Sequence, residues 1–137
     1  MILVDSSAWV EFDRATGSAV DRTLTDLITS DGPIAVTEPI VMEVCAGART
    51  ESREKDLRRL LARFHLERFD AAADFNAAVT IYRACRRVGV TPRGLIDSLI
   101  AAVALRGGHQ LLARDRDLTN VARVMDLPLH PAVPAQR

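Results

Sequence analysis

The sequence lacks the features that define several large classes of protein. Its 137 residues contain no apolar run near the roughly 20 residues that a membrane-spanning helix needs. The only cysteines, Cys45 and Cys85, form no C-x-x-C pair, so we expect two buried free thiols rather than a disulfide or a metal site. The only histidines, His65, His109 and His130, show no ligand spacing. We expect them at the surface, which argues against a zinc site.

Common catalytic motifs are also absent. The sequence has no P-loop, no dinucleotide-binding glycine pattern, no G-x-S-x-G and no H-E-x-x-H. Its net charge is zero, which argues against bulk electrostatic attraction to nucleic acid. Aromatic residues make up only 4% of the chain, and we expect Trp9 and Phe12 in the core or in a partner groove.

Short apolar segments alternate with helical patterns along the chain. The spacing predicts strands at 1–4, 34–36, 65–69 and 110–113, and an extended piece at 127–129. It predicts a helix after residue 5 and further helices at 17–30, 37–47, 51–64, 71–88, 94–106 and 117–125. This alternation is typical of an α/β domain with a parallel sheet of four or five strands, covered by helices on both faces. We expect one domain over residues 1–130 and an irregular C-terminal tail over 131–137.

Five acidic residues stand within or beside apolar sequence, where an ionised carboxylate is costly unless it is paired or bound to a cation. They are Asp5, Glu43, Asp97, Asp115 and Asp117. Asp5 directly follows the first predicted strand, and Asp115 follows the last. Ligands of such sheets bind at the carboxyl ends of the strands, so both acids should lie at the same edge. Glu43 and Asp97 lie on helices that must pack on the sheet, and we expect both to point inward.

A pocket of carboxylates needs a cation. Four carboxylates within ~5 Å of one another would repel by about 3 kcal/mol per pair at an effective dielectric of 20. Mg²⁺ or Mn²⁺ would remove this repulsion, and one or two such ions suit phosphoryl chemistry with activated water. Each acid also has a structural alternative. Asp5, Asp115 and Asp117 could cap helices, and Glu43 and Asp97 could form buried salt bridges with arginines.

Four motifs together carry a family resemblance. In chain order they are D-S-S-A-W-V, P-x-x-x-E-V, L-I-D-S-L-I-A-A-V-A and L-L-A-R-D-R-D-L. With these motifs in this order, the sequence resembles a PIN domain and, more narrowly, the VapC toxins of prokaryotic toxin–antitoxin pairs. The resemblance implies a three-layer α/β/α fold and a Mg²⁺- or Mn²⁺-dependent endoribonuclease in the cytoplasm. It also implies a cognate antitoxin and a homodimer.

The resemblance implies roles for single residues as well. The family's catalytic, metal-binding acids are matched by Asp5, Glu43, Asp97 and Asp115, and an additional metal-binding acid of many members is matched by Asp117. Ser7 matches a small hydroxyl residue that supports the first carboxylate or a metal-bound water. The chain departs from the pattern at Ala113, where many relatives have Thr or Ser, and at Leu118, where many have Phe. The first departure leaves the choice between Asp115 and Asp117 open.

The substrate contacts and two rival functions complete the expectations. Arg93, Arg114 and Arg116 flank the acids and could bind RNA phosphates. The arginine-rich helix at 51–64 could extend this row of phosphate contacts, although its charges also fit a solvated face with i,i+4 pairs.

Two other functions are possible for the same sequence. A catalytically silent PIN-like binding module is one alternative to the ribonuclease. Another Mg²⁺-dependent phosphoryl-transfer enzyme, such as a small phosphatase, is the second.

Overall fold

Four parallel strands form the central sheet in the order β3-β2-β1-β4. In the computed structural model, which describes residues 1–135, they are β1 (Ile2–Val4), β2 (Ile34–Val36), β3 (His65–Leu66) and β4 (Gln110–Leu112). Ile2 of β1 is in register with Ile34 on one side and with Gln110 on the other. The predicted parallel sheet is therefore confirmed, with four strands among the described residues.

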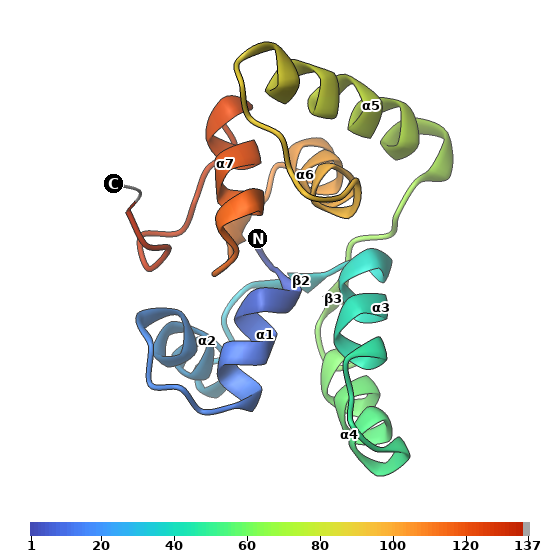
Figure 1. Ribbon diagram of the computed structural model, residues 1–137. Helices are drawn as coiled ribbons and strands as arrows, with labels where there is room; N and C mark the ends of the chain where they lie inside the picture. Colours follow the sequence, from blue (N-terminus) through green and yellow to red (C-terminus); the bar gives the residue numbers. More distant parts are fainter. Residues whose placement is uncertain (136–137) are drawn as a thin grey trace.

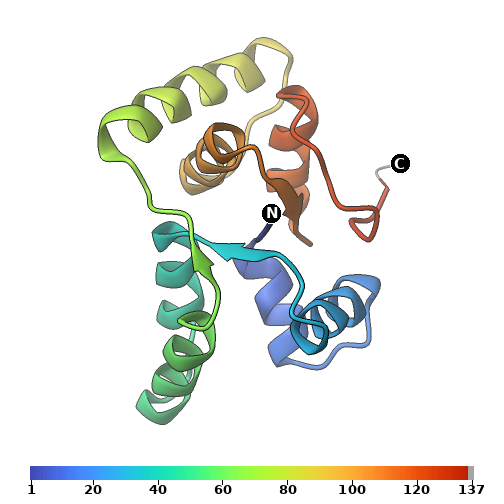
Figure 2. The ribbon, with the colours of Figure 1, turned by 180° about the vertical axis from the view of Figure 1, so that it is seen from behind.

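Helices cover both faces of this sheet (Figure 1). One side carries α1 (Ser6–Asp13), α2 (Ala19–Thr29), α3 (Glu38–Ala46) and α4 (Glu51–Leu61). The other side carries α5 (Ala71–Arg87), α6 (Ile96–Gly107) and α7 (Arg116–Val124). Figure 2 shows the same layers from behind, with α6 between α5 and the sheet. The expected three-layer α/β/α architecture is confirmed.

The direction in which the chain crosses the sheet explains the layers. From β1 to β2 to β3 each connection moves one strand in the same direction, and its helices lie on one side. From β3 to β4 the chain returns past β2 and β1, so the usual right-handed crossover places α5 and α6 on the other side. The reversal lies between the neighbouring strands β1 and β4, which is where α/β sheets bind their ligands.

The core confirms several expectations and corrects one. Trp9 is 2% exposed and packs in the core, and Cys45 and Cys85 are both buried and free. His109 was expected at the surface, but it is 5% exposed, and its Nε2 lies 2.7 Å from Oε1 of Glu67. The physical reason is tertiary: a polar partner from the chain after β3 allows the ring to be buried at the start of β4, and sequence spacing does not reveal such a partner.

The boundaries differ most where helices end. The helix expected over 51–64 ends at Leu61, and the strand expected over 65–69 covers only two residues. Leu129 makes an isolated bridge to Leu111, so the piece at 127–129 adds to the edge of β4. Beyond it the chain is irregular to residue 135, although Val133 joins the core. The domain boundary at residue 130 stays a prediction, and residues 136–137 of the expected tail lie outside the described residues.

Within residues 1–135, no helix combines the length and the apolar character that crossing a membrane requires.

A buried ion pair fastens α5 to α6. Asp74 is 1% exposed and accepts hydrogen bonds of 2.9 Å from both Nε and an Nη of Arg106, and its Oδ2 also accepts the Asp70 backbone N–H at 2.8 Å. Burial alone would raise the pKa of Asp74, but the bonds from Arg106 and from the Asp70 backbone hold it below its usual value. The carboxylate is therefore fully compensated where it is buried.

We predict that Asp74→Ala lowers the free energy of unfolding by about 2–3 kcal/mol, because it leaves Arg106 against the protein without its main partner. Urea denaturation followed by circular dichroism measures this change. The matched control is Asp56→Ala on α4, where the side chain is 53% exposed, and we expect little effect there. Equal effects of the two substitutions would contradict the assignment.

Candidate metal centre

The sheet and three helices bring the five predicted acids toward one place. Asp5 directly follows β1, and its backbone N–H donates to the carbonyl of Leu112 at the end of β4, at 2.9 Å. Asp115 follows β4, and Asp97 lies in the first turn of α6. Glu43 comes from α3. The candidate site therefore lies at the carboxyl edge of the sheet, where the strand order reverses.

Asp5 is both a helix cap and a buried acid. It is 3% exposed, and its Oδ2 accepts from the backbone N–H of Ser7 at 3.0 Å and from the Ser7 hydroxyl at 2.6 Å. The capping alternative is thus correct for Asp5, but both of these hydrogen bonds fall on Oδ2. The Ser7 hydroxyl in turn accepts the backbone N–H of Arg114 at 2.8 Å, which ties α1 to the segment after β4. Capping and cation binding can use different oxygens of this carboxylate.

Asp97, Asp115 and Asp117 form the tightest acidic group. One carboxylate oxygen from each lies within 4.8 Å of the other two. Asp115 caps α7, because its Oδ1 accepts from the backbone N–H groups of Asp117 at 2.8 Å and Leu118 at 3.2 Å. The alternative that Asp117 is the N-cap is therefore wrong. Asp117 lies in the first turn of α7 and accepts a hydrogen bond of 2.8 Å from Nε of Arg93.

Glu43 is half-buried at the edge of this group. Its Oε1 accepts a hydrogen bond of 2.9 Å from the hydroxyl of Ser6. Among the described residues neither Glu43 nor Asp97 forms an ion pair with an arginine, so the buried salt bridges considered for them are wrong. Ser6 was not predicted from the sequence. The D-S-S triplet could have indicated its role, because two successive hydroxyls at the start of a helix face different sides and can each reach a different acid.

The charges of these acids perturb one another. Burial raises the pKa of Asp5 to about 6, against the opposing hydrogen bonds from Ser7, and the charges of Glu43 and Asp115 raise it further. Burial also raises the pKa of Asp97 to about 7, and the charges of Asp115, Asp5, Glu43 and Asp117 add to the shift. By contrast, the hydrogen bond from Arg93 holds the pKa of Asp117 below its usual value. Among residues 1–135, no arginine, lysine or histidine forms an ion pair with Asp5 or Asp97.

This donor set fits a hard divalent cation. All the donors are carboxylate oxygens, which such ions prefer, and three of them already lie close enough to share one ion. Burial first, and the neighbouring negative charges second, raise the pKa values of Asp5 and Asp97, and such an ion would compensate both effects. The cluster could therefore hold a divalent metal ion.

The three predicted RNA-binding arginines have different surroundings. Arg93 is 87% exposed and bonds to Asp117, while an Nη of Arg114 lies 3.1 Å from Oε1 of Glu11. Arg116 is exposed, and no ion pair of its side chain is present among residues 1–135. The contact of all three with RNA stays a prediction.

The raised pKa of Asp97 predicts how stability depends on pH. Its pKa is near 3.8 when unperturbed and about 7 in the fold, so the folded chain binds more protons between these values. Without divalent cations, the free energy of unfolding should therefore fall as the pH rises through this interval. Asp97→Asn should raise it at pH 8 by on the order of 1 to 2 kcal/mol, a figure reduced for solvent screening at a part-exposed carboxyl.

Urea denaturation in EDTA across this pH range measures both effects. Asp26→Asn, at an exposed position on α2, is the control and should keep the pH dependence of the wild type. If Asp97→Asn also kept the full wild-type dependence, Asp97 would not be the group that causes it.

Comparisons with known proteins agree with this geometry. The family model described as "PIN domain" matches residues 2–124. The chain is 44% identical to Ribonuclease VapC11 of Mycobacterium tuberculosis, over 93% of this chain and 96% of that protein. It is similar in fold to VapBC2 of Rickettsia felis bound to a fragment of promoter DNA, with a TM-score of 0.72, 18% identity and coverage of 95% and 98% of the two chains. A toxin–antitoxin complex from Klebsiella pneumoniae gives a TM-score of 0.68, with 19% identity and coverage of 98% and 97%.

The family model covers most of the chain, and the identity to VapC11 extends over nearly the whole of both proteins. The resemblance carried by the four sequence motifs is therefore confirmed. The chain belongs to the PIN domain family and, within it, to the VapC group.

Proposed function

We propose that this protein is a metal-dependent endoribonuclease that acts as the toxin of a toxin–antitoxin pair. The carrying observation is the group of Asp97, Asp115 and Asp117, whose carboxylate oxygens lie within 4.8 Å of one another. The nearly full-length identity of 44% to a VapC ribonuclease supports RNA as the substrate class. A site of carboxylates at a switch point suits hydrolysis of a phosphodiester more than chemistry that needs a covalent nucleophile.

The ion that best fits this chemistry is Mg²⁺, with Mn²⁺ as a substitute. When bound, it would supply activation of a water nucleophile and neutralisation of the charge on the phosphate. Asp5, Asp97 and Asp115 would hold the ion, and Glu43 would contribute from α3. Ser7 orients the Asp5 carboxylate through its hydroxyl, at 2.6 Å. Ser6 fixes one oxygen of Glu43 in the same way.

Asp115 is a better candidate ligand than Asp117. The cap bonds of Asp115 both fall on Oδ1, so Oδ2 can face the ion. Asp117 shares its charge with Arg93, and that ion pair lowers its pKa and its need for a second cation. We therefore place Asp117 at the edge of the site, where it completes the acidic group and positions Arg93 beside the substrate.

The proposed partners follow from the same family. Solved structures of similar fold are complexes of toxin with antitoxin, which supports a cognate antitoxin for this chain. An apolar groove of about 710 Å³ between α3 and α4 offers a surface for the antitoxin. Its lining residues include Met42, Cys45, Leu61 and Phe64.

A homodimer is supported by two apolar side chains on α5, Phe75 and Val79. Both are more than half exposed, and they lie four residues apart on the helix. The RNA substrate places the toxin's action in the prokaryotic cytoplasm.

A substitution that keeps a helix cap while removing a charge tests the site. Asn caps helices about as well as Asp, so Asp115→Asn should keep the fold. It should slow Mn²⁺-dependent RNA cleavage by more than about a hundredfold, because even residues behind a metal ligand cost up to that factor. The measurement is cleavage of a labelled RNA pool, resolved on a gel.

Asp70→Asn is the matched control. Asp70 caps α5 with two backbone N–H bonds of 3.0 and 3.3 Å, and it lies outside the acidic group. This variant should cleave like the wild type. Full activity of Asp115→Asn would refute its assignment as a ligand.

The same assays separate the two rival functions. A catalytically silent binding module would cleave no RNA and would show no stabilisation by Mn²⁺. A working metal site, in Mn²⁺ at 100 times its Kd, would instead raise the free energy of unfolding by about 2.7 kcal/mol. A phosphatase would release phosphate from phosphomonoesters and leave RNA intact. Either pattern in the wild-type protein would replace the proposed activity.

A further inference from the structure

One basic side chain reaches the acidic group at the carboxyl edge of the sheet. Arg93 lies in the loop between α5 and α6, and its Nε donates to Oδ2 of Asp117 at 2.8 Å. Its backbone N–H donates to the same oxygen at 3.3 Å. Among residues 1–135, no other arginine, lysine or histidine forms an ion pair with any of the five acids. The chain therefore brings one cation of its own to this group.

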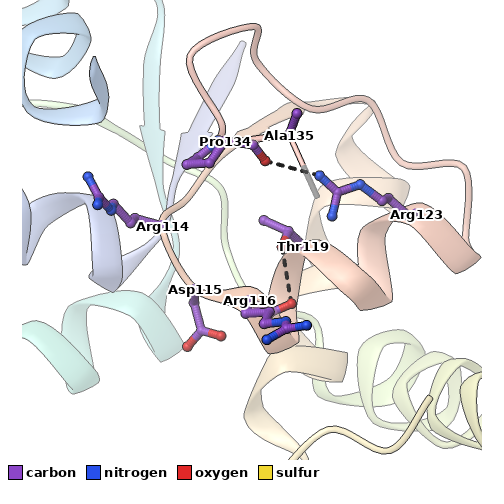
Figure 3. Close-up of a pocket in the computed structure, with 7 residues that line it drawn as sticks. All are labelled: Arg114, Asp115, Arg116, Thr119, Arg123, Pro134 and Ala135. Carbon is purple, nitrogen blue, oxygen red and sulfur yellow. Dashed lines mark hydrogen bonds between the residues drawn. The ribbon is translucent and has the colours of Figure 1, made fainter. Parts of the chain in front are cut away.

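The arginines on either side of Asp115 are arranged differently. An Nη of Arg114 lies 3.1 Å from Oε1 of Glu11, on α1. Figure 3 shows the side chains of Arg114 and Asp115 leaving the backbone in opposite directions, so the carboxylate points away from that guanidinium. Arg116 begins α7 and forms no ion pair among the described residues. Arg93 is thus the cation that binds the acids directly.

The five acids form two parts that share Asp97 and Asp115. In the inner part, burial raises the pKa of Asp5, and the nearby charges of Glu43 and Asp115 raise it further. In the outer part, one carboxylate oxygen from each of Asp97, Asp115 and Asp117 lies within 4.8 Å of the other two. Each part has enough carboxylates for one hard divalent ion, so the acids alone would allow two ions.

We propose that the guanidinium group of Arg93 takes the place of a second metal ion, so that the centre binds one divalent cation tightly, at its inner part. The proposal rests on the proposed metal-dependent function. The outer part already holds a positive charge, at Asp117. A divalent ion there would have to share this carboxylate with Arg93 or displace the guanidinium. Repulsion between the two cations would lower the affinity for that ion.

Water weakens this ion pair on one side only. The Arg93 side chain is 87% exposed, whereas that of Asp117 is 23% exposed. An exposed ion pair is weak by itself, but the bond from the Arg93 backbone N–H keeps the loop beside Asp117 while the guanidinium moves. We therefore expect Arg93 to weaken the binding of a second ion on the order of tenfold and not to abolish it.

A guanidinium group can supply part of what a second ion supplies. In sites with two metal ions, the second ion neutralises negative charge that develops on the leaving oxygen. Arginine stays charged at every pH at which proteins fold, and it needs no ion from solution. Arg93 would thus complete the centre with a fixed charge of the chain itself.

Counting bound ions tests the proposal directly. The full chain is titrated with Mn²⁺ at pH 8, above the pKa of about 7 of Asp97, and free Mn²⁺ is followed by its electron paramagnetic resonance signal. The wild type should bind one ion tightly, and a second at least about tenfold more weakly. Arg93→Gln should bind the second ion about tenfold more tightly than the wild type does, with the first ion nearly unaffected.

Three further variants separate charge from other effects. Arg93→Lys keeps the positive charge and should bind ions like the wild type. Arg87→Gln removes an exposed arginine at the end of α5 and should also bind like the wild type. Adding Asp117→Asn to Arg93→Gln removes the outer carboxylate, so the gained second ion should be lost again.

The outcomes separate this proposal from the proposed function. It is overturned if the wild type binds two ions with similar affinity, or if Arg93→Gln gains no second ion. A purely structural role of the Arg93–Asp117 pair would leave the ion count unchanged and lower only thermal stability, which also overturns it. Wild-type protein that binds no Mn²⁺ would refute the metal centre and this role of Arg93 together. One tight ion without RNA cleavage would refute the ribonuclease and leave the role of Arg93 standing.

Discussion

Repulsion among carboxylates at the carboxyl edge of the sheet is the constraint on which the site depends. Asp5 and Asp115 follow neighbouring strands, and the backbone bond from Asp5 to Leu112 holds the ends of these strands together. Helix α6 is fixed by a buried apolar face, so Asp97 cannot retreat from them. The fold therefore buries like charges together at the expense of its own stability: burial, and after it the neighbouring charges, raise the pKa values of Asp5 and Asp97.

The surrounding residues limit this cost without removing it. Helix capping satisfies one oxygen of Asp5 and one of Asp115, while the hydroxyl of Ser6 satisfies one oxygen of Glu43. Arg93 forms its ion pair with Asp117, at the exposed side of the group. The remaining oxygens are available for a cation. The buried carboxylate of Asp74, by contrast, is paired with Arg106.

Much of the fold and of the acidic site could be predicted from the sequence because the patterns that indicate them are local. The strand at 34–36 was predicted to the residue. The positions of Asp5 after β1 and of Asp115 after β4 followed from the order of strands and acids along the chain. What could not be predicted depends on tertiary contacts between distant segments. The partner of His109 is Glu67, the partner of Asp117 is Arg93, and Ser6 reaches Glu43 from another helix. Asp115 rather than Asp117 became the cap because α7 begins at residue 116, and element boundaries are weakly encoded in local sequence.

A crystal soaked in Mn²⁺, with diffraction recorded at the manganese absorption edge, tests the central claim most directly. The acids of three separate elements should share one divalent cation, so we expect an anomalous peak within coordination distance of Asp5, Asp97 and Asp115, with oxygen ligands alone. A peak held by surface acids elsewhere, or no peak at this edge of the sheet, would contradict the account.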